Sequence, residues 1–400
     1  MLRVVKEGFM NLVALKMLVG DRAKYLGIIM GLTFASLLIT QQSAIFLGLM
    51  TRTFGFVSDT GLPDIWVMDP KVQFIDDIKP MQDTALYRVR GIEGVGWAVP
   101  LYKGLIKARL DNGEFQTCNV VGLDDATLIG GPPTMVEGTL ADLRRADGVI
   151  VDEVGAVDKL AKKFYDANGQ EIVAKRRPLR IGDTLELNDN RAIVVGICRV
   201  SRTFQSQPVV YTTYTRATRF APRERKLLSF VLVKAKPGQD VNELTQRIRA
   251  QTGLGAYTGW GFAEKTYRYF MKYTGIPINF GISVTLGFIV GTAIAGQTFY
   301  NFTLDNLRHF GTLKAMGAGN LMLLRMILMQ SLIVGIIGYG LGVGLASLFG
   351  LLAGNSELAF LLPWQLLAVA AGAVLLICMA SALLSIRKVI SLEPAIVFKG

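Results

Sequence analysis

Few residues of this chain have the types and spacing that catalysis or metal binding requires. A zinc site needs about four nitrogen, sulfur or oxygen ligands, yet Cys118, Cys198 and Cys378 share no CxxC spacing and His309 is the sole histidine. A Ser-x-x-Lys match at Ser385–Lys388 lies at the end of an apolar stretch, which favours a helix terminus over a nucleophile. No Gly-x-x-x-x-Gly-Lys-Ser/Thr nucleotide-binding loop occurs. The chain is therefore predicted not to be an enzyme and to carry no cofactor or metal ion of its own.

The composition indicates that much of this chain lies in an apolar environment. Of its 400 residues, 51% are hydrophobic and only 18% are charged, and the mean hydropathy is +0.39. Disordered chains have low hydrophobicity, and disulfide scaffolds are short and rich in cysteine, so both classes are excluded. So little polar surface could not cover this much apolar material in water, which argues against a wholly soluble protein.

Four long stretches lack Asp, Glu, Lys and Arg altogether, and each is long enough to cross a membrane as a helix. A bilayer core of about 30 Å requires about 20 helical residues. The stretches cover residues 25–50, 273–304, 326–356 and 358–386. The predicted fold class is therefore an α-helical membrane protein with four transmembrane helices and a large extracytoplasmic α/β domain between the first two of them.

Residues 1–24 have the pattern of an amphipathic helix. Apolar residues recur at helical spacing, at Leu2, Val5, Phe9 and Leu12. Such a helix can lie along the membrane surface or pack against the protein's own spans, and the sequence leaves both possibilities open. A cleavable signal peptide is not expected, because the apolar stretch that follows is too long.

The distribution of lysine and arginine predicts the orientation in the membrane. Eleven basic residues lie in the N-terminal arm, in the loop of residues 305–325 and in the tail of residues 387–400, whereas the connection around Glu357 has none. Basic residues in short loops favour the cytoplasmic side. Both termini and the 305–325 loop are therefore predicted to be cytoplasmic, and residues 51–272 to lie outside.

The net charge of +12 does not indicate a nucleic-acid partner. Of the 43 basic residues, 32 lie within residues 51–272, together with 26 of the 31 acidic residues. The positive excess is thus divided between the two sides of the membrane. No single basic surface is predicted that could follow a nucleic-acid backbone.

Residues 51–272 have the pattern of a mixed α/β domain. A strand–helix–strand pattern occurs near each end, and a loop-rich insertion is predicted between them at about residues 123–215, which gives two nested subdomains. Strands are expected at Asp64–Met68, Leu105–Leu110, Thr117–Gly122, Ala192–Ile197, Val209–Thr213 and Phe230–Lys234. Helices are expected at Met81–Arg90, Glu153–Lys163 and Val241–Gln251.

Two cysteines, Cys118 and Cys198, fall in predicted strands of this outer domain. A disulfide could persist outside the cytoplasm, but the sequence does not establish the distance between the two strands. Two buried free thiols are the favoured interpretation.

The segment of residues 302–320 joins the second and third spans and is mildly basic. An apolar series at three-residue spacing is followed by two helix-breaking glycines: Phe310, Leu313 and Met316, then Gly317 and Gly319. A short amphipathic helix of this kind can fill a groove on a partner protein, or it can simply turn the chain at the membrane surface. The residues alone favour neither role.

Three motifs resemble those of the MacB/FtsX-type permeases of ABC transporters, and especially the DevC-like ones. Residues 310–318 (FGTLKAMGA) are similar to the segment after the second span of that family, residues 22–31 (RAKYLGIIMG) to the start of its first span, and residues 385–395 (SIRKVISLEPA) to its closing motif. The order of one span, a large outer domain and three spans is also the family's order. The family usually has Glu where this chain has His309.

The resemblance implies a permease subunit of the bacterial inner membrane that works as a pair with a separate ATPase, which binds ATP and Mg²⁺. Motion would pass from the cytoplasmic helix to the outer domain, which would engage a periplasmic adaptor and a TolC-like outer-membrane duct. Extraction of lipoproteins or lipids, and FtsX-like activation of a cell-wall hydrolase, stay open as alternatives. The residues implied to couple to the ATPase are Asp305, Arg308, His309, Phe310, Leu313, Lys314, Met316 and Gly317.

Small residues recur at four-residue spacing in two spans: Gly287, Gly291 and Ala295, and Gly340 and Gly344. Such faces let helices approach closely, so they are predicted either to pack within the four-helix unit or to join two permease copies. Interhelical hydrogen bonds are possible from Gln41, Gln42, Gln297 and Gln330. The absence of Asp, Glu, Lys and Arg from the span cores disfavours an ion-coupled carrier.

Overall fold

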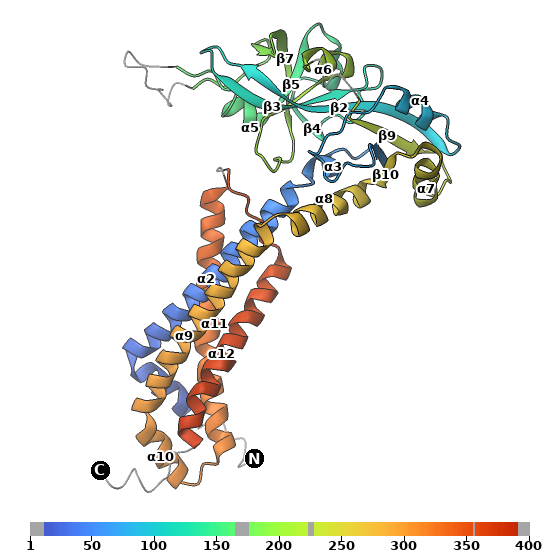
Figure 1. The fold of residues 1–400 in the computed structure, drawn as a ribbon. Coiled ribbons are helices and arrows are strands. Elements are labelled where there is room, and N and C mark those ends of the chain that lie inside the picture. Colours follow the sequence, from blue (N-terminus) through green and yellow to red (C-terminus); the bar gives the residue numbers. More distant parts are fainter. Residues whose placement is uncertain (1–11, 165–175, 223–227, 355–356, 391–400) are drawn as a thin grey trace. The chain divides into compact units, whose positions relative to one another are not determined.

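The computed structural model describes residues 12–164, 176–222, 228–354 and 357–390, with only the backbone for residues 387–389. The chain divides into a helical unit of residues 1–49 and 275–400 and an α/β unit of residues 50–274 (Figure 1). It passes between them twice: within α2 (Arg22–Arg52), and between α8 (Gly259–Tyr273) and α9 (Ile276–Asp305).

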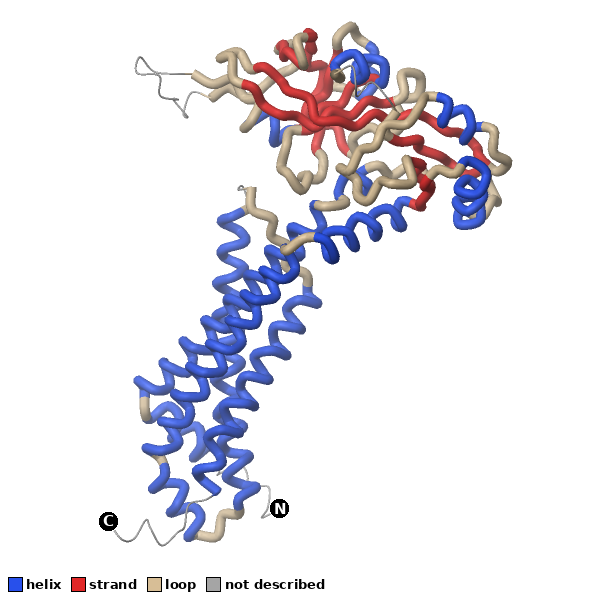
Figure 2. The backbone as a smooth tube through the Cα atoms, in the orientation of Figure 1, coloured by secondary structure: helices blue, strands red, loops and turns tan. Residues whose placement is uncertain are grey.

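Four helices in the described part of the chain are long and apolar enough to cross a membrane (Figure 2). They are α2, α9, α11 (Asn320–Ala353) and α12 (Trp364–Ile390). α11 begins six residues before the predicted span, because Leu321–Leu324 continue its apolar pattern across Arg325. α12 begins later than predicted because Pro363 disfavours a helical conformation in the residue before it.

Residues 12–20 are helical and belong to the helical unit. Ala14 and Leu18 are buried in its core, whereas Leu12, Leu15 and Val19 on the other face are exposed. One face of this helix therefore packs against the spans, and its opposite apolar face is left for lipid or a partner. The predicted apolar positions Leu2, Val5 and Phe9 lie outside the described residues.

The spans pack closely where small residues meet. A Cβ added to Gly342 of α11 would lie only 2.5 Å from the Cβ of Ser36 in α2. Ser36 also donates a hydrogen bond through Oγ to the carbonyl of Tyr339, at 3.3 Å. The Tyr339 hydroxyl in turn donates to the Leu367 carbonyl at 3.0 Å. Side chains that would be costly to expose to lipid thus find backbone partners on neighbouring helices.

The α/β unit contains a four-stranded antiparallel sheet with the strand order β10-β1-β9-β2. With the helices that follow β1 and β9, this order is the ferredoxin-like split βαβ arrangement. The elements are β1 (Ile65–Met68), α4 (Thr84–Arg90), β2 (Val95–Arg109), β9 (Phe230–Ala235), α7 (Val241–Thr252) and β10 (Gly255–Thr258). β1 side chains alternate between two cores, with Ile65 and Val67 packed towards α4 and α7, and Trp66 and Met68 on the other face.

A six-stranded barrel is inserted between β2 and β9. From the second half of β2 the pairing runs through β3, β8, β5, β7 and β6 and returns to β2, where Ala108 pairs with Leu187. These strands are β3 (Phe115–Leu123), β5 (Gly148–Asp152), β6 (Thr184–Leu187), β7 (Asn190–Arg199) and β8 (Val209–Thr213), and β4 (Thr134–Glu137) pairs with β7. The insertion therefore starts near Tyr102, and not at residue 123 as predicted, because the long strand β2 belongs to both subdomains.

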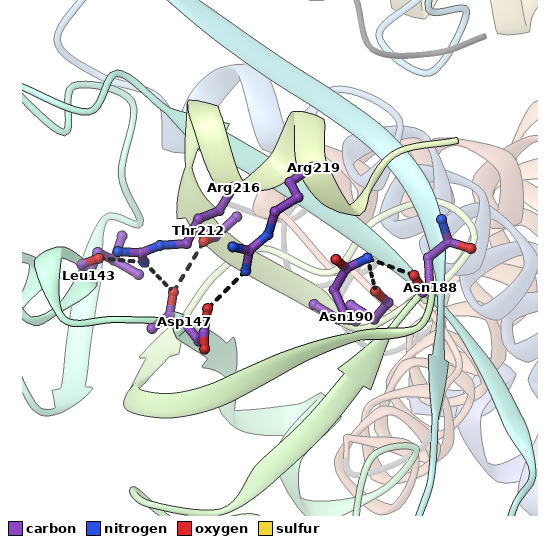
Figure 3. Close-up of polar contacts among 9 residues, drawn as sticks. Leu143, Asp147, Asn188, Asn190, Thr212, Arg216 and Arg219 are labelled. Carbon is purple, nitrogen blue, oxygen red and sulfur yellow. Dashed lines mark hydrogen bonds and ion pairs between the residues drawn. The ribbon is translucent and has the colours of Figure 1, made fainter. Parts of the chain in front are cut away.

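Two short helices flank the barrel. The helix expected at Glu153–Lys163 is only α5 (Glu153–Val157), in which two valines and a glycine lower the helix propensity. α6 (Tyr214–Phe220) packs on the barrel interior, and Arg216 donates to the carbonyls of Leu143 and Gly148 at 2.6 and 2.9 Å (Figure 3). Burial lowers the pKa of Arg216. Because these donors are directed at backbone carbonyls, we assign this contact to stabilisation of the barrel.

The three cysteines are free and buried. Cys118 on β3 belongs to the core inside the barrel, whereas Cys198 on β7 belongs to the core on the opposite face of the sheet. Their side chains therefore point to different sides of the barrel wall, and no disulfide joins them. Burial raises the pKa of both thiols, which disfavours the reactive thiolate form.

Candidate functional site

The candidate site is the turn between α9 and α11, which is mostly helical. α9 ends at Asp305, and α10 (Leu307–Ala315) follows after the single residue Asn306. The Asn306 side-chain amide donates to the Phe302 carbonyl at 2.9 Å, which satisfies one of the last carbonyls of α9. The predicted loop of residues 305–325 is thus a nine-residue helix between two breaks.

The inner face of α10 packs into the core of the helical unit. Phe310 has an exposed fraction of 0%, and Leu313 is half-buried against the same core. Phe310 and Leu313, which the resemblance implied as ATPase contacts, are thus covered completely and in part by the protein's own spans. Three-residue spacing alone cannot tell which members of a series the protein's own spans cover.

The outer face of α10 is exposed and carries mixed chemistry. Arg308, His309, Thr312 and Met316 lie on it at the spacing of one helical face, and all four are exposed. Met316 has an exposed fraction of 68%. The surface available to a partner is therefore one large flexible apolar side chain beside a guanidinium and an imidazole.

Gly317 ends α10 in a left-handed conformation, with φ of +89°. The N–H of Gly317 donates to the Lys314 carbonyl and that of Ala318 to the Leu313 carbonyl, both at 3.0 Å. These two bonds form a Schellman motif, which closes a helix and reverses the chain direction. A side chain at residue 317 would meet no neighbour within 4 Å, so backbone conformation alone requires glycine here.

Asp305 is already engaged within the helical unit. Lys24 forms an ion pair with Asp305 at the end of α9 and lies 2.9 Å from Asp21. Hydrogen bonds from Lys24 lower the pKa of Asp21. The assignment of Asp305 to ATPase contact is thus weakened, since its carboxylate instead links the start of the first span to the end of the second.

Two further hydrogen bonds join neighbouring helices of the helical unit. Lys314 donates from Nζ to the Ile390 carbonyl of α12 at 3.1 Å. The fully buried Gln330 of α11 donates to the Ala14 carbonyl at 2.7 Å, as an interhelical bond. Residues 12–20, α10 and the C-terminal end of α12 therefore lie at one end of the helical unit (Figure 1).

The two small-residue faces have different surroundings. A Cβ on Gly291 of α9 would lie 2.3 Å from the Cβ of Ala35 in α2, and Gly287 faces Leu38. With Ala295 also buried, this face packs within the protomer. Gly340 and Gly344 of α11 have nothing within 4 Å, so theirs is the face left open for another molecule.

In the α/β unit, one loop connects the barrel to the segments that continue the first two spans. We call residues 200–208, between β7 and β8, the barrel loop. Ser201 bonds to Asp59 of α3 (Gly55–Asp59), the helix that follows α2. Phe204 packs on Phe270 of α8 with ring centroids 4.8 Å apart. No motif in the sequence indicated this loop, because these two contacts join residues that are 142 and 66 positions apart along the chain.

Comparison with known families assigns the two units. The MacB-like periplasmic core domain model matches residues 26–251, and the FtsX-like permease C-terminal model matches residues 278–394. The first match alone covers more than half of the chain. The chain belongs to the MacB/FtsX family of ABC transporter permeases. The predicted fold class, with four apolar helices and a large α/β domain after the first, is confirmed for this permease.

Individual relatives of this permease are distant. An uncharacterised ABC transporter permease of Methanocaldococcus jannaschii is 24% identical over an alignment of 189 positions, which covers 44% of this chain and 46% of that protein. The alignment thus spans less than half of the curated relative's length.

Two solved structures resemble the outer domain. The periplasmic region of MacB from Actinobacillus actinomycetemcomitans gives a TM-score of 0.36 at 13% identity, covering 55% of this chain and 97% of that structure. The extracellular domain of the noncanonical transporter YknZ from Gram-positive bacteria gives a TM-score of 0.32 at 11% identity. That match covers 49% of this chain and 98% of that structure. At such scores these likenesses carry no weight, and the assignment rests on the family models.

The sequence raised two possible sites of chemistry, a metal cluster and the Ser-x-x-Lys match. Within the described ranges no group of three or more His, Cys, Asp or Glu side chains could hold a metal ion. Ser385 is buried, and its hydroxyl donates a hydrogen bond to the Ser381 carbonyl within α12 at 3.0 Å. The site thus consists of a helix whose inner face is buried in the core and whose outer face is exposed, at the end where an ion pair joins the first and second spans.

Proposed function

We propose that this permease is the membrane subunit of an ABC export system in a bacterial inner membrane, with α10 as the contact for a separate ATPase. The end with α10, residues 12–20 and the α12 terminus is cytoplasmic, and residues 51–272 lie on the opposite side. ATP and Mg²⁺ bind the partner, since this chain has no nucleotide-binding loop.

The two-sided seating of α10 carries the proposal. Phe310 anchors the helix in the core of the spans, while Met316 and Arg308 stay outside. A partner that moves the outer face must therefore move the helix as a whole. Because α10 is joined directly to α9 and through a tight turn to α11, that motion reaches two spans at once.

Contacts along the spans support transmission to the outer domain. The ion pair between Lys24 and Asp305 joins the first and second spans at the α10 end. The close packing of Gly291 against Ala35 joins the same two spans nearer to the α/β unit along the chain. Both spans continue covalently into the α/β unit through α3 and α8. In that unit α3 and α8 share one core, to which Phe56 and Phe262 belong, so the two spans act on a single body.

The remaining parts of the proposal concern partners. Two permease copies face one another through the open Gly340 and Gly344 face of α11. The outer domain engages a periplasmic adaptor and a TolC-like outer-membrane duct, as the resemblance to DevC-like systems implies. Export of substrate from the periplasmic side is the activity that we propose for this arrangement. The span cores contain no charged residue that an ion-coupled pathway would use, which supports an ATP-driven system over an ion-coupled carrier.

Replacement of Met316 by Asp tests the proposal. Met316 is exposed, so Met316→Asp changes stability by about 0.5 kcal/mol or less, but a charged side chain at an interface anchor costs at least about 2 kcal/mol of binding. The ATP-hydrolysing subunit that co-purifies with the wild-type chain is expected to be lost, and Met316→Leu to retain it. Leu62→Asp, at an exposed apolar residue of the α/β unit, is the matched control.

Two results would contradict the proposal. One is ATP hydrolysis by the purified chain alone. The other is a Met316→Asp variant that keeps both the ATPase subunit and the export phenotype at wild-type levels.

A further inference from the structure

A groove in the α/β unit lies beside the last three turns of α8. Its volume is about 580 Å³, and its walls are aromatic and basic. We call it the α8 groove, defined by Tyr257, Lys265, Arg268, Tyr269, Lys272 and Tyr273. The α10 site and the spans contribute nothing to it, and neither the comparisons nor the coupling role accounts for it.

The aromatic walls of the groove are held in place by stacking. Tyr269 stacks on Phe74 with ring centroids 4.5 Å apart and contacts Tyr273 at 5.4 Å. The Tyr257 ring contacts two cations, with Lys265 Nζ 4.3 Å and the Arg249 guanidinium carbon 4.5 Å from its ring centroid. The tyrosine rings are therefore fixed surfaces, on which apolar and polar groups of a ligand can both rest.

The charge of the groove is positive. Lys265, Arg268 and Lys272 face a single acid, Glu264, which pairs with Arg268 at 2.6 Å. Lys265 donates to the Tyr257 hydroxyl at 3.0 Å. Lys272 is exposed, and its contact among the described residues is with the Tyr273 ring, at 5.2 Å. The groove thus has a charge of +2 and an ammonium group free to bind an anion.

The groove lies close to the membrane by covalent constraint alone. Tyr273 is three residues before Ile276, the first residue of the second span. Three residues reach at most about 11 Å, and the polar headgroup layer is about 5–7 Å thick on each side of the hydrocarbon core. The last turn of α8 therefore lies within about 11 Å of the start of the second span, a distance comparable with the thickness of the headgroup layer.

We propose that the α8 groove binds the headgroup phosphate of an anionic membrane phospholipid. Lys272 and Arg268 contact the phosphate, and the rings of Tyr269 and Tyr273 support the glycerol region. Each basic residue near an anionic surface contributes roughly a fivefold preference for it. A lipid held here would fix the end of α8 to the membrane surface. The proposal depends on the permease being a membrane protein and not on its coupling to an ATPase.

Lipid binding by the full-length chain in detergent tests the proposal. Native mass spectrometry measures retention of added phosphatidylglycerol relative to phosphatidylcholine. Lys272→Gln is expected to lower the preference for phosphatidylglycerol about fivefold, and Lys272→Arg to preserve it. Lys107→Gln, at an exposed lysine of β2 on the barrel, is the control and should change nothing. Because Lys272 is exposed, the variants fold, and thermal unfolding in phosphatidylcholine checks this.

Two outcomes would overturn the proposal. The first is an unchanged preference in Lys272→Gln, which would mean that the retained lipid lies elsewhere on the spans. The second is stabilisation by inorganic phosphate, without lipid, that depends on Lys272 and equals the effect of phosphatidylglycerol, which would make the groove a site for a soluble anion.

Discussion

Asp59 and Ser201 are 142 residues apart in the chain and are joined by two hydrogen bonds. The Ser201 backbone N–H donates to Asp59 Oδ2 at 2.7 Å, and the Ser201 hydroxyl donates to Oδ1 at 2.8 Å. Asp59 is the last residue of α3, which continues the first span, and Ser201 is the second residue of the barrel loop. The pair therefore connects the segment that a moving span would displace to the barrel that would act on a partner.

Asp59→Ala is predicted to uncouple the outer domain without unfolding it. Loss of these hydrogen bonds at a half-exposed position costs about 1–2 kcal/mol, which the α/β unit can tolerate. Amide hydrogen exchange of residues 201–207 should rise, and export activity should fall while ATP hydrolysis continues. Ser58→Ala, at the exposed neighbouring residue, should leave both unchanged. Unaltered exchange and export in Asp59→Ala would show that the pair transmits nothing.

Gly317→Ala is predicted to destabilise the turn after α10 through backbone strain. A non-glycine residue in the left-handed region costs about 1–2 kcal/mol, and no side-chain clash adds to this, because residue 317 has open space around it. Gly319→Ala is a matched control, since Gly319 also has no neighbour within 4 Å but has φ of −73°. Thermal unfolding in detergent should separate the two variants. Equal unfolding temperatures of the two variants would contradict the prediction, because they would mean that residue 317 can leave the left-handed conformation without a cost in stability.

The small-residue faces should respond differently to the same kind of substitution. Gly291→Ala places a methyl group 2.3 Å from Ala35 Cβ and is predicted to cost about 1–3 kcal/mol by overpacking. A Cβ at residue 340 has no neighbour within 4 Å in its own protomer, so Gly340→Leu is expected to fold normally while the permease dimer weakens. Thermal unfolding and chemical cross-linking measure the two effects. A Gly340→Leu variant with undiminished dimer would assign that face to lipid.

Cysteine labelling should reveal opposite sides for α10 and the α/β unit. The three native cysteines are buried, so a membrane-impermeant maleimide should leave the wild-type chain unlabelled. Lys236→Cys, at an exposed turn, is predicted to label in intact cells, and Thr312→Cys on the outer face of α10 only after permeabilisation. Labelling of both residues under the same condition would contradict the proposed orientation.

The spans and several strands could be predicted from the sequence because their determinants are local. A run of some 20 uncharged residues is stable as a helix in lipid wherever it occurs, and the four runs correspond to α2, α9, α11 and α12. Alternating or continuous β-branched residues likewise predicted β8 and β9, whose observed bounds Val209–Thr213 and Phe230–Ala235 match within a residue. The family motifs at residues 310–318 and 385–395 could also be identified from the sequence, because each is a continuous segment of the chain.

Tertiary structure alone decided which of the predicted site residues are buried and which stay exposed. Phe310, Leu313 and Met316 form one apolar series, but the spans bury the first, half-bury the second and leave the third exposed. Asp305 pairs with Lys24, and the barrel closes where Ala108 pairs with Leu187. Such contacts join residues far apart in the chain, and their free energy depends on which surfaces the folded chain brings together. Local hydrophobicity and secondary-structure propensity therefore determined where the helices and strands form. Long-range packing determined which faces of them are buried and which stay exposed.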